Sequence, residues 1–172
     1  MKPSKPEVDI QAETRIGVLS DSHGDANRTR IAVEELVRLG ATMFIHCGDI
    51  ETIECLDSLA GLNAHIVFGN CDEPSELQDY ARSIGITVHH PLGEFIVDGH
   101  RIAFTHGDDP KCMQSPIDSK AHWLFHGHTH HKRDVKIQST RVVNPGALYR
   151  AKPHTVALVT PMIGAVQFET IS

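Results

Sequence analysis

The first half of the chain alternates short apolar segments with longer segments of helical period, and this alternation most limits the folds open to it. Strands are predicted over 15–20, 42–47 and 64–68, because these segments are short, apolar and bounded by polar turn residues. A helical period follows each of them, and the first ends at Gly40, a residue typical of helix C-termini. This β-α-β-α order predicts an α/β fold with a largely parallel sheet and crossover helices.

The second half of the chain is richer in strands than the first. Two apolar runs flank Asp98 and Gly99, which is the strongest short-range signal for a β-hairpin. Further short strands are predicted over 122–127, 134–139 and 141–146, and a closing hairpin over 155–172. This strand content requires a second sheet or a large extension of the first.

Length and composition narrow the class of protein. The 172 residues fit one domain with a substantial core, and contents of 40% hydrophobic and 22% charged residues are ordinary for a soluble globular protein. Residues 1–14 are polar and lack the apolar centre of a signal peptide, so we expect a disordered leader there and a single domain over 15–172. No apolar run approaches the roughly 20 residues that span a bilayer. We therefore expect a cytoplasmic protein without a membrane partner.

The charge distribution disfavours nucleic acid as a partner. The net charge is −6 with histidine neutral, and no long basic run is present, whereas a nucleic-acid surface usually shows a basic stripe. The short basic clusters at 28–30 and 130–133 are expected to be solvated, with a local grip on a phosphate as the alternative. The four cysteines form no Cys-x-x-Cys pair, so reduced thiols are expected. A homo-oligomer is compatible with the sequence.

Potential metal ligands follow five of the predicted strands directly. In open α/β sheets ligands gather at the carboxyl ends of the strands, so we expect these side chains to meet at one edge. Packing alone does not account for so many polar residues in equivalent places. The seven candidates are Asp21, His23, Asp49, Asn70, His106, His126 and His128.

The spacing of these residues fits two metal ions. Residues two apart in an extended chain project to the same side, about 6.5–7 Å apart, as in the pairs Asp21/His23 and His126/His128. Side chains converging from that separation can address two ions about 3.5–4 Å apart. Asp49 is placed to bridge them, because a carboxylate can offer one oxygen to each ion.

The donor set also constrains the metal and the substrate. Two aspartates and neutral ligands leave a site with two divalent ions positively charged, which attracts a phosphate ester. Nitrogen and oxygen donors without thiolate suit manganese, iron, zinc, nickel or cobalt better than calcium. Manganese is the expected metal, with the other four as alternatives.

Five motifs in order resemble a known pattern: "DSHG" (21–24), "GDI" (48–50), "GNCD" (69–72), "THG" (105–107) and "GHTH" (127–130). On these motifs the chain is similar to the calcineurin-like metallophosphoesterases, and nearest to the small branch with the bacterial phosphodiesterases and the retromer subunit vacuolar protein sorting 29. The resemblance runs from Arg15 to about Gly146 and includes the late "NPG" (144–146).

The resemblance implies a four-layer αββα sandwich with mixed sheets and a binuclear metal site at one end. Its residues would divide into a first ligand set of Asp21, His23, Asp49 and His128, and a second of Asp49, Asn70, His106 and His126. A hydroxide held between the ions would be the nucleophile, with Asp49, Asn70 and His128 as the catalytic residues. The implied activity is that of a metal-dependent phosphoric ester hydrolase, a phosphodiesterase acting on a small or nucleotide-like substrate.

Alternatives remain open at several points. A phosphomonoesterase would share the site, and an interaction scaffold of the vacuolar protein sorting 29 type would share the fold, although scaffolds commonly lose metal ligands and all seven positions are filled here.

Cys71 stands where many members of the superfamily have histidine, and a buried neutral thiol is expected there. His130 is balanced between a supporting and a solvated role, and Asp72 is expected to cap the helix beginning at Pro74. Segments 72–84 and 107–122 are expected to cover the pocket.

Overall fold

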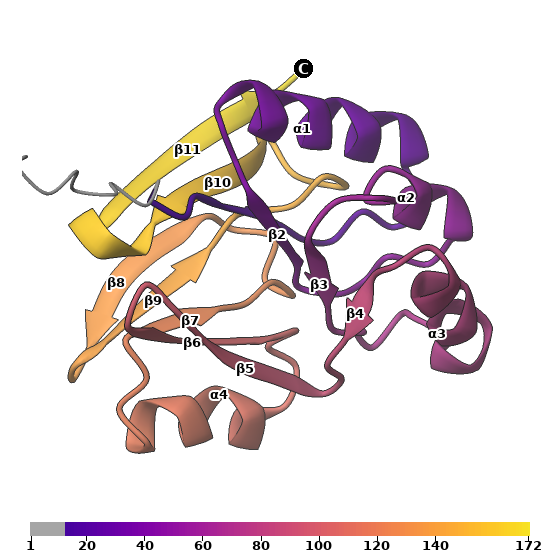
Figure 1. The fold of residues 1–172 in the computed structure, drawn as a ribbon. Helices are drawn as coiled ribbons and strands as arrows, with labels where there is room; N and C mark the ends of the chain where they lie inside the picture. Colours follow the sequence, from indigo (N-terminus) through magenta and orange to yellow (C-terminus); the bar gives the residue numbers. More distant parts are fainter. Residues whose placement is uncertain (1–12) are drawn as a thin grey trace, which may run out of the picture.

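The computed structural model describes residues 13–172, and it contains two mixed β-sheets with helices on their outer faces (Figure 1). The leader predicted over 1–14 lies outside the described residues except for its last two. The fold is the predicted four-layer αββα sandwich, with α1, α2 and α3 beside the first sheet and α4 beside the second (Figure 1).

The first sheet has six strands in the order β11-β10-β1-β2-β3-β4, of which β1 to β4 are parallel and β10 and β11 antiparallel. Its strands are β1 (Ile16–Leu19), β2 (Met43–His46), β3 (Ala64–Ile66), β4 (Thr87–Val88), β10 (His154–Thr160) and β11 (Ala165–Ile171). The helices beside it are α1 (Ala26–Arg38), α2 (Ile53–Asp57) and α3 (Pro74–Ser83). A short 3₁₀ helix, Pro161–Ile163, joins β10 to β11.

The second sheet has five strands in the order β5-β6-β7-β9-β8, with a parallel centre and antiparallel edges. Its strands are β5 (Leu92–Val97), β6 (His100–Thr105), β7 (Trp123–Phe125), β8 (Arg133–Ile137) and β9 (Thr140–Asn144), and its outer helix is α4 (Pro110–Asp118). The hairpin predicted at Asp98 and Gly99 joins β5 to β6, and both residues have positive φ as a tight turn requires. The predicted second sheet is therefore confirmed.

Strand alternation explains why four layers form. Successive side chains of a strand point to opposite faces, so a strand buried on both faces supplies two cores. In β1, Val18 belongs to the core between the sheets and Leu19 to the core under the helices of the first sheet. In β7, Phe125 packs between the sheets and Leu124 packs toward α4. The apolar runs of the sequence are continuous because both faces are covered.

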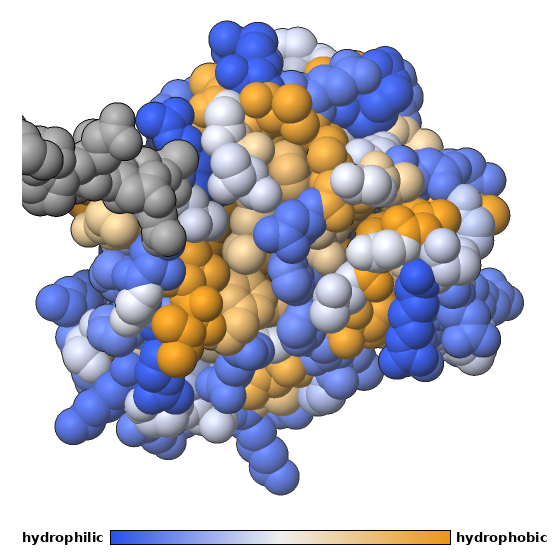
Figure 2. All heavy atoms as spheres, viewed as in Figure 1, coloured by the Kyte–Doolittle hydropathy of each residue, from blue (hydrophilic) through white to orange (hydrophobic). Residues whose placement is uncertain are grey.

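The surface carries few large apolar side chains. Hydrophilic side chains dominate the rim of the face in Figure 2, and apolar ones are concentrated toward its middle. In the described part of the chain, no helix has the length and apolar content to cross a bilayer.

Candidate metal centre

The loops after β1, β2, β6 and β7 are held together by backbone hydrogen bonds beyond the strand ends. Asp21 N–H donates to Gly48 O over 3.0 Å, and Gly127 N–H donates to His106 O over 2.8 Å. Two glycines make this approach possible: a Cβ at Gly69 would overlap the Asp49 carboxylate, and one at Gly127 would overlap Ser20 and Asp21. The carboxyl ends of both sheets therefore deliver polar side chains to one place, as the sequence predicts.

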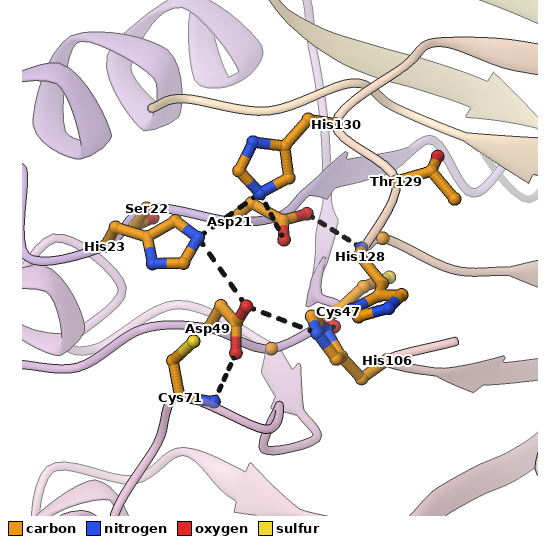
Figure 3. A network of polar contacts seen from close by, with 12 residues as sticks. Asp21, Ser22, His23, Cys47, Asp49, Cys71, His106, His128, Thr129 and His130 are labelled. Atoms are coloured by element: carbon orange, nitrogen blue, oxygen red, sulfur yellow. Dashed lines mark hydrogen bonds and ion pairs between the residues drawn. The ribbon is translucent and has the colours of Figure 1, made fainter. Parts of the chain in front are cut away.

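One group of converging side chains consists of Asp21, His23 and His130 (Figure 3). Asp21 Oδ1 lies 3.2 Å from His130 Nε2, and His130 Nε2 lies 3.3 Å from His23 Nε2. The opposite nitrogen of His23, Nδ1, lies 2.7 Å from the Glu51 carboxylate. Because this contact orients the ring with Nδ1 toward Glu51, Nε2 of His23 faces the group.

A second group consists of Asp49, Asn70 and His106. His106 Nδ1–H donates to Cys47 O over 2.8 Å, so its tautomer is set by the backbone and Nε2 faces the site. That Nε2 lies 3.1 Å from Asn70 Oδ1 and 3.3 Å from Asp49 Oδ2. The ring of His128 packs against the ring of His106, with 5.1 Å between their centroids.

Asp49 belongs to the second group and lies between His106 of that group and His23 of the first (Figure 3). Its Oδ2 is 3.5 Å from His23 Nε2 and 3.3 Å from His106 Nε2, and its Oδ1 accepts a hydrogen bond of 2.9 Å from Cys71 N–H. One oxygen of a single carboxylate thus faces imidazoles of both groups.

The electrostatics separate the two aspartates. Burial would raise the pKa of Asp49, but hydrogen bonds from His106 and the Cys71 backbone, with the charges of His106 and His23, lower it to about 2. Burial would lower the pKa of His106, but its contact with Asp49 raises it to about 9. For Asp21, burial dominates and raises the pKa. Asp49 and His106 therefore attract each other as an ion pair, and a bound cation would take the place of the proton on His106 Nε2.

The nitrogen and oxygen atoms of the first group are arranged to bind a metal ion rather than to form hydrogen bonds with one another. Asp21 is fully buried, and its Oδ1 accepts no well-formed hydrogen bond from residues 13–172. Two imidazole nitrogens, one of His23 and one of His130, face each other and this oxygen. A cation in this position would satisfy all three, and nitrogen and oxygen donors without thiolate match the manganese-to-zinc series.

A cavity of about 420 Å³, which we call the main cavity, opens over both groups. It is lined by His23, Asp49, Glu51, Asn70, Cys71, His128, His130, Tyr149 and Arg150. The segments 72–84 and 107–122 do not line it, so the prediction that they cover the pocket was wrong: most of each forms a helix, α3 or α4, that packs on a sheet. Glu51, Tyr149 and Arg150 were missed, because their only signal in the sequence is proximity to "GDI" and "NPG".

The structure separates the predicted ligands into two classes. Six of the seven contribute atoms to the two groups or to the main cavity: Asp21, His23, Asp49, Asn70, His106 and His128. His126 does not line the cavity; it is 3% exposed, and its Nδ1–H donates to Gly127 O over 3.0 Å. Its Nε2 is buried without a hydrogen-bond partner among residues 13–172. His130 occupies the place beside Asp21 and His23 instead.

Backbone strain is concentrated at the same place. In the described chain, ten residues other than glycine have positive φ, a conformation that is uncommon for L-residues and often marks functional sites. Seven of them contribute to the two groups or the main cavity: Asp21, His23, Asp49, Glu51, His128, His130 and Arg150. The fold holds these side chains in position at a local energetic cost.

Two acidic residues near the site, Asp72 and Asp25, accept hydrogen bonds from backbone N–H groups. Asp72 does not cap α3, whose N-cap is Glu73. Its carboxylate instead accepts hydrogen bonds from the N–H groups of Ile50, Glu51 and Gly69, at 2.6–2.8 Å, and so ties together the two loops that carry Asp49 and Asn70. Asp25 caps α1 by accepting a hydrogen bond from the N–H of Arg28.

Cys71 is exposed at the cavity rather than buried as predicted. Desolvation and the nearby carboxylates, Asp49 first among them, raise its pKa. A thiol of raised pKa is neutral at pH 7, so it is neither a good metal ligand nor a nucleophile. The prediction of a neutral thiol is supported, and the prediction of burial was wrong.

His46 is a buried neutral histidine that supports the first loop. Its Nδ1 accepts from Gly48 N–H over 3.2 Å, so its Nε2–H donates to Ser22 Oγ over 2.8 Å. Burial lowers its pKa to about 3. Unfolding exposes the ring and restores a pKa of about 6.5. Between pH 6.5 and 3 the unfolded state therefore binds the extra proton, and the free energy of unfolding falls as the pH falls.

We expect the variant His46→Gln to be less sensitive to acid than the wild type. Between pH 7 and 4.5 the wild type should lose about 2–3 kcal/mol through this residue, and the variant should lose that much less. Urea unfolding of both proteins at the two pH values measures the difference. The exposed Ser139, changed to alanine, carries no titratable group; it is the control and should leave the pH dependence unaltered. An unchanged pH dependence in His46→Gln would contradict this account.

Comparison with known proteins agrees with the geometry. The sequence model of the calcineurin-like phosphoesterase superfamily domain matches residues 14–162. Phosphodiesterase MJ0936 of Methanocaldococcus jannaschii is 28% identical over 139 residues, which are 77% of this chain and 82% of that protein.

Solved structures share the fold. A structure described as a novel archaeal phosphodiesterase has a TM-score of 0.83 at 23% identity and covers 92% of this chain and 100% of its own. Vps29 of Chaetomium thermophilum has a TM-score of 0.62 at 15% identity and covers 91% of this chain and 96% of its own. Both results concern architecture, and the assembly of the two groups described above rests on this chain's own residues.

Proposed function

Because the chain belongs to the calcineurin-like phosphoesterase superfamily, we propose that it is a metal-dependent hydrolase of phosphodiesters. The observation that carries the proposal is the position of Asp49 Oδ2 between His23 and His106. A carboxylate so placed can bind two ions at once, which a site for a single ion does not require. The relative named as a phosphodiesterase supports the choice of diesters over monoesters.

We propose two divalent ions. Their ligand set differs from the predicted one in the histidines of the segment "FHGHTHH" (125–131). Asp21, His23, Asp49 and His130 would hold the first ion, and Asp49, Asn70, His106 and His128 the second. His126 leaves the set because it neither lines the main cavity nor belongs to any group of converging donor atoms. Manganese is the expected metal, and iron, zinc, nickel and cobalt fit the same donors.

The reaction is hydrolysis, in which a water oxygen bonds to phosphorus and one ester P–O bond breaks. Bound divalent ions would lower the pKa of water and neutralise charge on the phosphate. The chain's own contribution is orientation: Glu51 turns Nε2 of His23 inward, and Cys47 O does the same for His106. The leaving alkoxide must gain a proton, and the neutral thiol of Cys71 is a weak acid for this task. We therefore expect a preference for esters with good leaving groups.

The experiment compares two chromogenic substrates and metals added singly. Protein freed of metal by a chelator and then dialysed should not cleave bis-p-nitrophenyl phosphate, and added Mn²⁺ should restore cleavage. The monoester p-nitrophenyl phosphate should be cleaved more slowly. Faster cleavage of the monoester would favour a phosphomonoesterase. Tight binding of Mn²⁺ without cleavage of either ester would favour the interaction scaffold suggested by the likeness to Vps29.

A further inference from the structure

A second cavity adjoins the main one and has a different character. It has a volume of about 250 Å³ and is lined by His130, His131, Lys132, Arg150, Ala151, Lys152, Pro153 and Thr155. His130 and Arg150 line both cavities, so the two adjoin at these residues. We call it the basic cavity, because three of its side chains are permanent cations at neutral pH.

The three cations are available to a ligand. None of the ion pairs formed within residues 13–172 involves Lys132, Arg150 or Lys152. Arg150 lies over the ring of Tyr149 and Lys132 over the ring of Phe168, at 5.1 and 5.6 Å from the ring centroids. Contacts with aromatic faces orient cations without neutralising them.

The charges around the main cavity are asymmetric. Glu51 and Arg150 both line the main cavity, and of the two only Arg150 also lines the basic cavity. An ester group that carries negative charge would be repelled by Glu51 and attracted toward Arg150. The planar guanidinium can also donate two parallel hydrogen bonds to a phosphate. Arg150 has positive φ, as Asp21, His23, Asp49, His128 and His130 do.

We propose that the basic cavity binds a second phosphate group of the substrate. This phosphate would be attached to one of the two organic groups that the phosphodiester links. This inference rests on the proposed function and narrows its substrate class to phosphodiesters that bear a further phosphate, such as a nucleotide diester phosphorylated at its other end. The volume of about 250 Å³ suits one phosphate group, whereas a nucleic-acid strand would need an extended basic surface.

The test compares two substrates that differ in one phosphate. Thymidine 5′-(p-nitrophenyl phosphate) and the same diester with a phosphate on its 3′-hydroxyl release the same chromophore. With Mn²⁺ present, the wild type should have about tenfold higher kcat/KM for the 3′-phosphorylated diester, as expected for one charge-assisted contact. Lys152→Gln and Arg150→Gln should bring the ratio of the two kcat/KM values close to one, and added salt should lower it in the wild type.

The ratio separates this inference from the proposed function. Damage to the metal centre lowers both rates and keeps the ratio, while loss of the basic cavity lowers the ratio. Lys111→Gln, in α4 and lining neither cavity, is the matched control and should keep the wild-type ratio. An equal kcat/KM for the two diesters in the wild type would overturn the inference.

A binding measurement covers the case in which neither diester is cleaved, which would count against the proposed function alone. Calorimetry on the Mn²⁺-loaded protein should then show about tenfold tighter binding of thymidine 3′,5′-bisphosphate than of thymidine 5′-phosphate. Lys152→Gln should abolish this difference. Equal affinities would overturn the inference, and affinity that rises with the length of an oligonucleotide would replace it with a nucleic-acid surface.

Discussion

Asp49→Asn is expected to lower the kcat/KM for bis-p-nitrophenyl phosphate by about 10³-fold or more. The variant keeps the volume of the side chain and an oxygen that can accept from Cys71 N–H. It loses the negative charge that lies 3.5 Å from His23 Nε2 and 3.3 Å from His106 Nε2. Removing a unit charge about 4 Å from a cation costs about 4 kcal/mol at an effective dielectric of 20, which corresponds to about 10³-fold.

The rate alone does not separate lost metal from lost fold, so two further measurements accompany it. Metal analysis should find two Mn²⁺ per wild-type chain and fewer in the variant. Circular dichroism should show that the variant remains folded. Asp118→Asn, at the exposed end of α4, is the control and should keep both rate and metal content. A folded Asp49→Asn protein with two Mn²⁺ and more than a tenth of the wild-type rate would contradict the bridging role.

The sequence predicts the layers of the fold better than its short elements. The short but continuous apolar runs of β1 and β2 can be recognised in the sequence because both faces of these strands are buried. The helix α4 was not predicted, and segment 107–122 was expected to be a loop. It contains Pro116, which lacks a donor and is rare within helices, and only Pro116 and Ile117 of its residues are buried. Packing of Ile117 against Ala103 and Leu124 of the second sheet accompanies a helix that local propensity does not favour.

The site residues whose positions follow from the strand topology could be predicted from the sequence. The histidines of the loop after β7 could not. Parallel strands bring their carboxyl ends together whatever the loops do, so the aspartates and Asn70 could be placed from the strand pattern. Within "FHGHTHH", however, the rule that residues two apart share a side fits His126 with His128 and His128 with His130 equally well. The rule assumes an extended chain. His128 and His130 have positive φ, so the chain is not extended there.

The backbone geometry favours the pair His128 and His130 over the pair His126 and His128 as the proposed metal ligands. His126 N–H donates to Val143 O, and Gly127 N–H to His106 O, which continues the alignment of β7 with its neighbours for two residues. His126 is thereby held in the sheet with its ring buried. Only after Gly127 does the chain turn, with His128 N–H donating to Asp21 Oδ2, and the next two histidines reach the cavity. Sequence spacing contains no information about where the sheet ends.

This assignment predicts opposite results for the same substitution at two positions of one loop. His130→Ala should lose about one Mn²⁺ per chain and at least about 10²-fold in kcat/KM, since replacing a residue that merely orients a ligand already costs 10–100-fold. His126→Ala should keep two Mn²⁺ and most of the rate. It should instead lose about 2–4 kcal/mol in the free energy of unfolding, because it leaves a cavity in a packed interior.

The two variants control for each other, because each lacks one imidazole from the same segment. Metal analysis, kinetics and urea unfolding on both give six values, and the assignment requires the metal loss and the stability loss to fall on different proteins. If His126→Ala loses the metal while His130→Ala keeps it, the buried and unpaired Nε2 of His126 is the ligand atom, and the loop must rearrange when metal binds. If both variants lose metal, three histidines of the loop take part and neither ligand set is right.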